Sequence, residues 1–303
     1  MEKKLSFTAG SDLHGERIDT AISRLYPDIT RSSLKSRGAE AFIDGIPRRF
    51  SHKLREGEKV ECVIPPDEDM SLHAQKIDFD IIYHDRHIAV INKPAGLPVH
   101  PSKGHSDHTL VNGLIHRFGN LSTGGDPFRP GIVHRLDMDT AGVMVVALTD
   151  EAHRRLVDSF KAREVKKLYL AVTKGHITPE TGVIDLPVGR SSRNRKKMAA
   201  YPKGAPNAKP AHTEYRVVEY LQNHSLVEIN IHTGRTHQIR VHLSHINHPV
   251  AGDPVYSRGS GGYGGMALFA KRLEFKHPVS GEMMEFETEM PAGFAKLLAG
   301  LRG

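Results

Sequence analysis

The chain has 303 residues, of which 38% are hydrophobic and 25% charged, as in ordinary globular proteins. That length is enough for about two domains. No stretch reaches the ~20 apolar residues of a membrane span, and residues 1–10 lack the apolar core of a secretory signal, so we expect a cytoplasmic protein without membrane contacts. The single cysteine, Cys62, excludes an internal disulfide and a cysteine-based zinc site.

The basic residues of the chain are clustered. The net charge is +7 and the isoelectric point is about 9.4, a moderate excess that is compatible with a polyanionic partner. Lysines and arginines concentrate in four segments, at residues 31–37, 48–55, 154–167 and 190–197. A solvated face would explain any one cluster, but four clusters favour a nucleic-acid partner.

A change in composition marks the expected domain boundary. Two prolines are followed by acidic residues in the segment Pro65–Met70, which is typical of a linker. We therefore expect a small domain over residues 1–66, a linker over 67–74 and a large domain over 75–303.

The small domain is expected to begin with two helices. Ile18, Ile22 and Leu25 recur at helical spacing. Thr30 can cap a second, short helix that carries three basic residues. These are Arg31 and Lys35, which share one helix face, and Arg37.

A hairpin and a strand should complete the small domain. Asp44-Gly45 between apolar residues is a strong signal for a two-residue hairpin turn. Val60, Cys62 and Ile64 alternate with other residues, as in a half-buried strand.

The large domain mixes strands and helices without a regular strand–helix–strand rhythm. Residues 88–92 and 143–148 are apolar and indicate buried strands, and residues 225–233 alternate. Thr149 can cap a helix whose first turn is acidic. The fold class is therefore α+β with a mixed, largely antiparallel sheet, and the glycine-rich segment 257–265 is expected to be a surface loop.

Asp137 is the first candidate site residue. It lies in a polar turn just before the apolar run 143–148, so it should stand at the mouth of a sheet. Its charged neighbours Arg135 and Asp139 favour a site, although an aspartate that only hydrogen-bonds its own turn is also common before a strand.

Two further candidates come from other segments. Tyr169 lies in the apolar run 167–172, where most tyrosines belong to the core. Arg240 lies in a segment with five histidines between residues 232 and 248. No zinc-protease pattern and no cysteine occur there, so we expect no metal site.

Three motifs of the large domain resemble those of the RluA-type pseudouridine synthases. His134, Arg135, Leu136, Asp137, Thr140 and Gly142 match the central motif, in which the aspartate is the catalytic nucleophile. Ala141 replaces the family's usual hydroxyl residue. The segment Asn92–Pro101 is similar to the first motif, and residues 232–243 with their tail at 248–256 are similar to the third. In the last matched stretch, Phe269 stands where the family usually has histidine.

The resemblance implies roles for five residues besides Asp137. Tyr169 would pack against the target base, and Arg240 would pair with Asp137, for which a bidentate guanidinium is well suited. Arg135 would enter the gap left by a flipped uridine, although an exposed arginine paired with Asp139 is an alternative. Arg235 and Lys167 are assigned to RNA binding.

The small domain is similar to the RNA-binding module named after a ribosomal small-subunit protein, over about residues 13–64. Residues 17–19, 30–32 and 42–45 carry this similarity. It implies that Arg31, Lys35 and Arg37 contact RNA. A small cap that merely packs on the enzyme is the alternative.

Together the resemblances imply an enzyme that isomerises uridine to pseudouridine in RNA, without a cofactor and as a monomer. The small domain points to the RluC-like or RluD-like subgroup, which acts on large-subunit ribosomal RNA. Transfer RNA is the alternative substrate, and a non-catalytic RNA-binding protein or a histidine-rich metal hydrolase is the alternative class. The sequence leaves open whether Asp137 attacks the uracil ring or the ribose.

Overall fold

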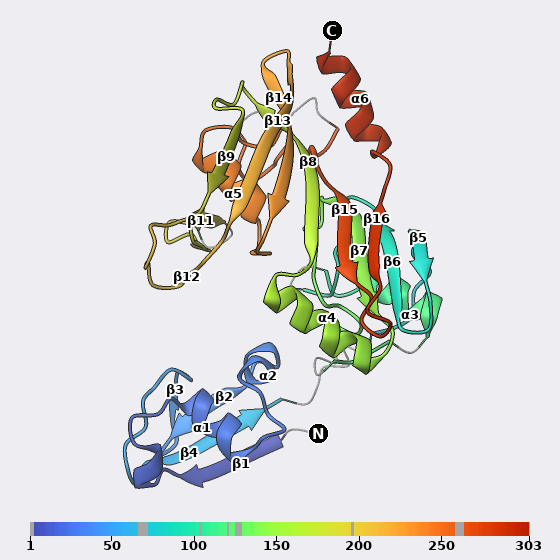
Figure 1. The fold of residues 1–303 in the computed structure, drawn as a ribbon. Coiled ribbons are helices and arrows are strands. Elements are labelled where there is room, and N and C mark those ends of the chain that lie inside the picture. Colours follow the sequence, from blue (N-terminus) through green and yellow to red (C-terminus); the bar gives the residue numbers. More distant parts are fainter. Residues whose placement is uncertain are drawn as a thin grey trace. The chain divides into compact units, whose positions relative to one another are not determined.

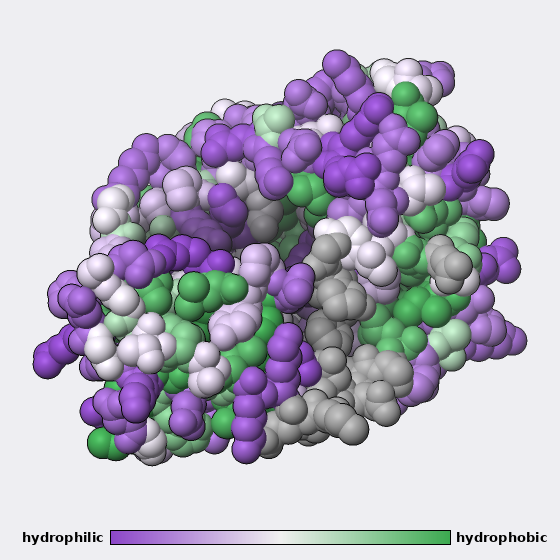
Figure 2. Space-filling view, turned by 90° about the horizontal axis from the view of Figure 1, so that it is seen from below, coloured by the Kyte–Doolittle hydropathy of each residue, from purple (hydrophilic) through white to green (hydrophobic). Residues whose placement is uncertain are grey.

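The computed structural model describes residues 3–65, 72–102, 105–119, 121–124, 129–194, 197–257 and 264–302. The chain divides into two compact units, residues 1–71 and residues 72–303, each with its own hydrophobic core (Figure 1). Residues 67–71 of the expected linker and residues 258–263 of the expected glycine-rich loop lie outside the described residues. Within the described ranges no helix is long and apolar enough to cross a membrane. Hydrophilic residues cover much of the face shown in Figure 2, between smaller hydrophobic patches.

The first unit is a four-stranded antiparallel sheet with two helices. The strand order is β1-β4-β2-β3. Its elements are β1 (Lys3–Thr8), the 3-10 helix η1 (Ser11–Leu13), α1 (Ile18–Leu25), α2 (Arg31–Ser36), β2 (Glu40–Ile43), β3 (Ile46–Arg48) and β4 (Lys59–Ile64).

The local predictions for this unit are confirmed. The backbone N–H of Ser33 donates to the Thr30 hydroxyl at 3.1 Å, which caps α2. Asp44 and Gly45 have φ values of 48° and 76°, the left-handed conformation that a tight hairpin turn needs. Apolar residues of β4 are buried at every second position. Strand β1 carried no clear sequence signal, because only Leu5 of its six residues is buried.

The second unit is built on a nine-stranded sheet, which confirms the α+β fold class. The order is β5-β6-β7-β15-β8-β14-β13-β9, and β16 pairs with β15. The β7–β15 pairing is parallel and the other pairings of this sheet are antiparallel. The strands are β5 (Asp80–His84), β6 (Ile88–Lys93), β7 (Ala141–Ala147), β8 (Lys166–Lys174), β9 (Thr181–Ile184), β13 (Thr213–Leu221), β14 (His224–Ile231), β15 (Leu268–Lys276) and β16 (Met283–Glu287).

A smaller sheet and four helices complete this unit. The small sheet has the order β11-β10-β12. Its strands are β10 (Val188–Arg190), β11 (Met198–Ala200) and β12 (Ala208–Lys209), and the helices are α3 (Leu110–Phe118), α4 (Asp150–Ala162), α5 (Gln238–His245) and α6 (Ala292–Leu301). Thr149 caps α4 as expected, by accepting the Ala152 N–H at 3.4 Å.

Strand β7 lies between β6 and β15, and all seven of its residues are buried. Met144 and Val146 pack in the same cluster as Leu114 of α3, whereas Val143 and Val145 pack in the cluster of Leu156 from α4. Helices therefore cover both faces of this strand, which explains why its sequence is a continuous apolar run and does not alternate. The strand begins at Ala141, two residues before the expected start.

Gly142 allows β7 and β15 to approach closely. Its φ is 122°, and a Cβ atom built there would lie 2.1 Å from the carbonyl oxygen of Ala270. A side chain at this position therefore meets both backbone strain and a backbone clash.

We expect Gly142→Ala to lower the free energy of unfolding by about 2–4 kcal/mol, because strain and overpacking add. Urea denaturation of the full-length protein measures this. Gly293→Ala is the matched control, since Gly293 lies in α6 with no atom within 4 Å of an added Cβ. Equal stability of the two variants would show that the β7–β15 approach tolerates a side chain.

Candidate active site

A cavity of about 480 Å³ in the second unit brings together six of the nine site residues expected from the sequence. It is lined by the loop before β7, by β8, by the end of α4 and by the segment from β14 into α5. The six residues are Arg135, Asp137, Lys167, Tyr169, Arg235 and Arg240. The other three, Arg31, Lys35 and Arg37, belong to the first unit.

Asp137 begins a tight turn that is hydrogen-bonded to the loop after β6. The Thr140 N–H donates to the Asp137 carbonyl at 3.1 Å, which closes the turn. The next carbonyl, that of Met138, accepts from the Gly96 N–H at 2.9 Å and from Lys93 Nζ at 2.8 Å. The loop after β6 therefore holds the turn in place.

Lys93 is fully buried although it is a lysine. Its Nζ donates at 2.8 Å to three carbonyls, those of Pro94, Leu97 and Met138. Burial lowers the pKa of Lys93 to about 7, against the opposing pull of Asp139 and Asp137. Three acceptors around one nitrogen favour the ammonium form, so Lys93 ties the two loops of the site together.

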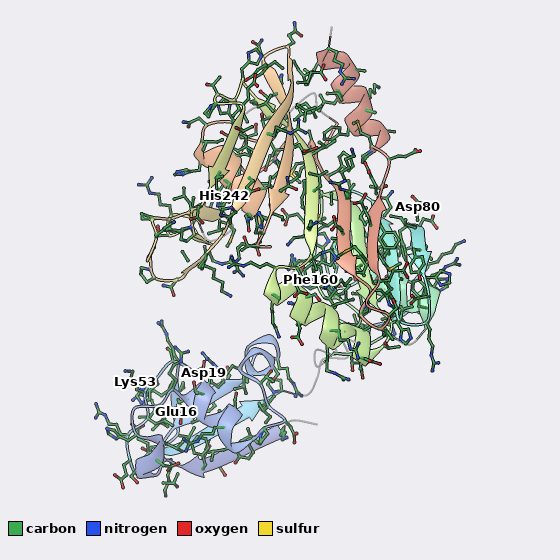
Figure 3. The ribbon with its side chains drawn as sticks, viewed as in Figure 1. Glu16, Asp19, Lys53, Asp80, Phe160 and His242 are labelled. Atoms are coloured by element: carbon green, nitrogen blue, oxygen red, sulfur yellow. The ribbon has the colours of Figure 1, made fainter. Side chains whose placement is uncertain are left out.

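His134 anchors the other end of the same loop. Its Nε2 accepts the Val145 N–H of β7 at 3.1 Å, and its ring stacks on Phe160 with centroids 4.6 Å apart. Phe160 lies near the end of α4 (Figure 3). Burial, with Lys167 nearby, lowers the pKa of His134 to about 3. This histidine is therefore a neutral acceptor that fixes the loop to the sheet.

Arg240 joins two carboxylates from distant parts of the chain. Its Nε and Nη2 donate to the two oxygens of Asp253 at 2.8 and 3.0 Å, and its Nη1 donates to Asp137 Oδ2 at 2.9 Å. The sequence led us to expect a bidentate pair between Arg240 and Asp137. The structure corrects this, because the bidentate partner is Asp253 and Asp137 receives a single hydrogen bond.

The charges of this triad are mutually supported. Asp253 is fully buried, and its Oδ1 also accepts the backbone N–H groups of Val255 and Tyr256. Burial is the largest single cause and raises the pKa of Asp253, but the hydrogen bonds and charge of Arg240, together with the two backbone hydrogen bonds, leave the pKa below its usual value. Burial likewise opposes the charge on Arg240, yet Asp253 and Asp137 raise its pKa. Asp137 is 17% exposed at its side chain, so its carboxylate is held but reachable from the cavity.

Tyr169 is a buried residue of the sheet that also lines the cavity. It is buried in β8 between Ile229 of β14 and Ala270 of β15, and it also lines the cavity with Asp137. Burial, and then the charge of Asp137, raise the pKa of Tyr169 above its usual value. Its hydroxyl is therefore protonated at neutral pH.

The basic residues of the cavity occupy its walls. Lys167 is buried with its Nζ 5.7 Å from the centre of the Phe160 ring, and burial together with Arg235 lowers its pKa to about 8. Arg235 Nε donates to the Pro210 carbonyl at 3.0 Å. Arg135 is exposed, and its Nη1 is 3.4 Å from His100 Nε2. Among the described residues no ion pair joins Arg135 to Asp139.

Two of the histidines after Arg240 contact neighbouring hydroxyl and carbonyl groups. His242 lies between the Thr213 hydroxyl and the Leu186 carbonyl, both at 2.9 Å (Figure 3). His248 Nδ1 contacts the Lys174 carbonyl at 2.9 Å. These rings fasten α5 and the following turn to neighbouring strands.

In the first unit, two of the three expected RNA-binding side chains make intramolecular contacts. Arg31 lies 3.3 Å from Asp19, which sits on α1 (Figure 3), and Arg37 Nη2 donates to the Pro65 carbonyl at 3.2 Å. Arg31 nevertheless remains 55% exposed at its side chain. The side chain of Lys35 lies outside the described part of the structure.

The fold and the site define an α+β enzyme domain with a carboxylate held at the wall of a basic cavity. The family described as RNA pseudouridylate synthase matches residues 87–245. "Ribosomal large subunit pseudouridine synthase D" of Yersinia pestis is 39% identical over 99% of this chain and 95% of its own length. An uncharacterised RNA pseudouridine synthase of Bacillus subtilis is 38% identical over 99% of this chain and 98% of its own.

The solved structures agree with these relatives. Human RNA Pseudouridylate Synthase Domain Containing 1 is 32% identical, with a TM-score of 0.60, over 73% of this chain and 87% of that one. The chain therefore belongs to the RNA pseudouridylate synthase family, and it is an RNA pseudouridine synthase.

We expect Asp253→Asn to impair turnover in a folded protein. The amide nitrogen would replace Oδ2 and face the Arg240 Nε–H, so a buried donor loses its acceptor, at a cost of about 1–3 kcal/mol. A shifted Arg240 would misplace Asp137, which reduces turnover roughly 100-fold. Tritium release from uridine-labelled RNA and urea denaturation measure the two effects. Asp80→Asn, at an exposed residue of β5, is the control and should leave both unchanged. Full turnover of Asp253→Asn would show that catalysis does not depend on the paired hydrogen bonds between Arg240 and Asp253.

Proposed function

We propose that this enzyme isomerises uridines in large-subunit ribosomal RNA. The support comes from relatives that are named ribosomal large subunit pseudouridine synthase D and are aligned along nearly the full chain. The alternative substrate is transfer RNA. Pseudouridine mapping across both RNA classes in cells with and without the gene tests the proposal. Loss of modification from transfer RNA alone would overturn it.

Asp137 is the proposed nucleophile, and one observation carries this role. Its carboxylate lies at the wall of the cavity and is held by Arg240, whose orientation is fixed by Asp253. A target base inside a stem must first leave the stack to reach this carboxylate. Asp137 then forms a covalent bond to the uracil ring or to the ribose anomeric carbon. Both routes need the same ionised, directed carboxylate.

The base is then rearranged inside the cavity. The bond from uracil nitrogen to ribose breaks, the uracil rotates, and a bond forms from its carbon five to the same ribose carbon. In both routes the bond to Asp137 then breaks, which restores the free carboxylate. Carbon five finally loses its hydrogen as a proton, the uracil nitrogen released from the ribose gains one, and no net electron is gained or lost. Tyr169 is the proposed packing surface for the base. The Tyr169 hydroxyl is protonated at neutral pH. It can accept the proton from carbon five only after it has donated its own proton to another group.

Asp137→Asn should abolish turnover and preserve RNA affinity, because an amide is not a nucleophile but keeps the size of the carboxyl group. Tritium release together with filter binding separates the two effects. Asp139→Asn, two residues away in the same turn, is the matched control and should retain most of the turnover. Substantial tritium release by Asp137→Asn would remove Asp137 from the nucleophile role.

Arg135 is proposed to hold open the helix that the uridine leaves. It is exposed beside the cavity and carries no carboxylate partner among the described residues, so its guanidinium is available to stack or to meet phosphate.

Arg135→Ala should slow the reaction on a structured stem-loop by roughly 10- to 100-fold, because Arg135 would no longer offset part of the free-energy cost of unstacking the uridine. The same substitution should have little effect on an RNA whose target uridine is already unstacked. Single-turnover rates on the two RNAs measure the difference. Equal slowing on both would assign Arg135 to the placement of Asp137 and not to helix opening.

The small unit is proposed to bind RNA through its second helix, where Arg31 is exposed. Removal of residues 1–66 should weaken RNA affinity and flatten its salt dependence, because each lost phosphate contact reduces counterion release. Filter binding at several salt concentrations, with the full-length protein as reference, measures this. Identical salt slopes would indicate that the unit acts only as a cap.

A further inference from the structure

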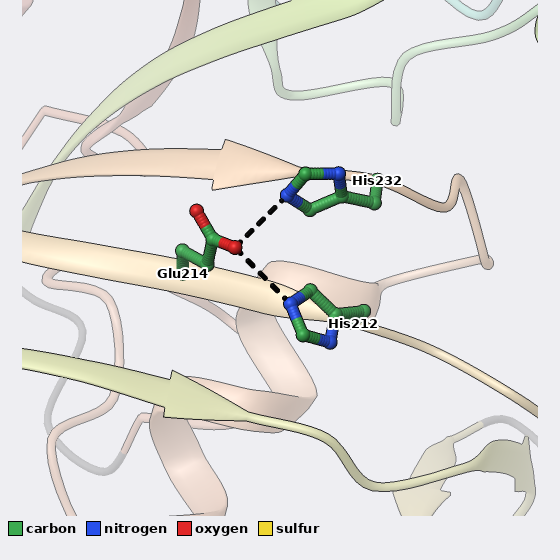
Figure 4. Close-up of side chains that lie close together, drawn as sticks. All are labelled: His212, Glu214 and His232. Atoms are coloured by element: carbon green, nitrogen blue, oxygen red, sulfur yellow. Dashed lines mark hydrogen bonds and ion pairs between the residues drawn. The ribbon is translucent and has the colours of Figure 1, made fainter. Parts of the chain in front are cut away.

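Two histidines and a glutamate converge at one end of β13 and β14, outside the Asp137 triad (Figure 4). His212 Nε2 and His232 Nε2 lie 3.2 and 3.0 Å from the same oxygen of Glu214, Oε1. We propose that His212, Glu214 and His232 form a binding site for one divalent transition-metal ion of the zinc type.

Paired strands hold the three residues in place. Thr213 of β13 is aligned with Ile231 of β14, and the His232 N–H donates to the His212 carbonyl at 3.3 Å. His212 and Glu214 are two positions apart, so they project from the same face, and His232 is the neighbour of His212 across the strands. The arrangement is fixed by backbone hydrogen bonds and not by a flexible loop.

The spacing of the donor atoms fits a single ion. Zinc binds imidazole nitrogen and carboxylate oxygen at about 2.1 Å, so two ligands of a tetrahedral ion stand about 3.4 Å apart. The two nitrogen–oxygen distances of 3.2 and 3.0 Å are close to this value, and the donor atoms lie within 4.8 Å of one another. An ion can therefore replace the present hydrogen bonds with small side-chain movements.

The chemistry of the donors selects the kind of ion. Two imidazoles and one carboxylate suit zinc, nickel or iron(II), whereas magnesium and calcium prefer oxygen ligands alone. Asp185 Oδ1 lies 3.5 Å from the other ring nitrogen of His212, which is the position of an outer carboxylate that orients a ligating histidine. The ligand side chains are 32%, 45% and 46% exposed, so water can fill the remaining positions.

The site adjoins the active-site cavity because His232 also lines that cavity. A bound ion would add two positive charges near Arg235, which follows three residues later on the same wall. The competing explanation is a proton-linked cluster, in which protonated histidines pair with Glu214 and no ion is needed. The hydrogen bond from His212 lowers the pKa of Glu214, and burial opposes this with a smaller effect.

Isothermal titration of the full-length, chelator-treated protein with ZnCl2 tests the proposal without RNA or turnover. We expect one ion per chain, no heat with MgCl2, and a rise in melting temperature on zinc addition. His212→Ala and His232→Ala should each weaken zinc binding by more than tenfold. Asp185→Asn should weaken it about 10-fold, as for other outer partners.

Two variants keep the test independent of folding defects. Glu214→Gln preserves side-chain size and should still lose zinc affinity, and circular dichroism melts verify that each variant is folded. His84→Ala removes an exposed histidine from β5, at the opposite end of the sheet, and should leave zinc affinity unchanged. No zinc binding, equal affinity in all variants, or equal loss in His84→Ala would overturn the proposal in favour of the proton-linked cluster.

Discussion

The paired hydrogen bonds from Arg240 to Asp253 are the interaction on which the geometry of the active site depends. A guanidinium held by two parallel hydrogen bonds cannot rotate about its own axis, so the direction of its third donor is fixed as well. That third donor is the one that meets Asp137. The fully buried carboxylate thus orients the arginine, and the arginine orients the carboxylate that is open to the cavity. Arg240 thus contacts Asp137 through a single hydrogen bond, which leaves the Asp137 side chain open to the cavity.

The turn that carries Asp137 is also held by two side chains that bind backbone groups. Lys93 and His134 both use nitrogen atoms to bind backbone groups, one at the Met138 carbonyl and the other at the Val145 N–H. Each of these contacts is partly buried, and a lost hydrogen bond in a buried place is costly. The turn that carries Asp137 is therefore positioned by these backbone contacts as well as by the hydrogen bond from Arg240.

The sequence predicted the parts of this site that lie within one motif. The turn before an apolar run placed Asp137 correctly, because local turn chemistry and strand periodicity are both visible in neighbouring residues. Asp253 and Lys93 were not recognised as site residues. Asp253 contacts Arg240, 13 positions away, and Lys93 contacts Met138, 45 positions away, and the spacing of apolar residues does not predict contacts over such separations. Helix α5 was also missed, because its residues are buried nearly all round and show little amphipathic pattern.

Ala141 and Phe269, the two departures from the family pattern, are neighbours in the sheet. Ala141 and Phe269 are aligned partners in the parallel β7–β15 pair, and the Phe269 ring packs edge-on against Phe294 at 5.2 Å. The two departures therefore lie side by side at the start of these strands, within the hydrophobic core. The replacement lies one residue from the turn that ends at Thr140, and it leaves the Asp137–Thr140 hydrogen bond and the Arg240 contact in place. The turn that carries Asp137 is therefore held without a hydroxyl group at position 141, through the contacts of Lys93, His134 and Arg240.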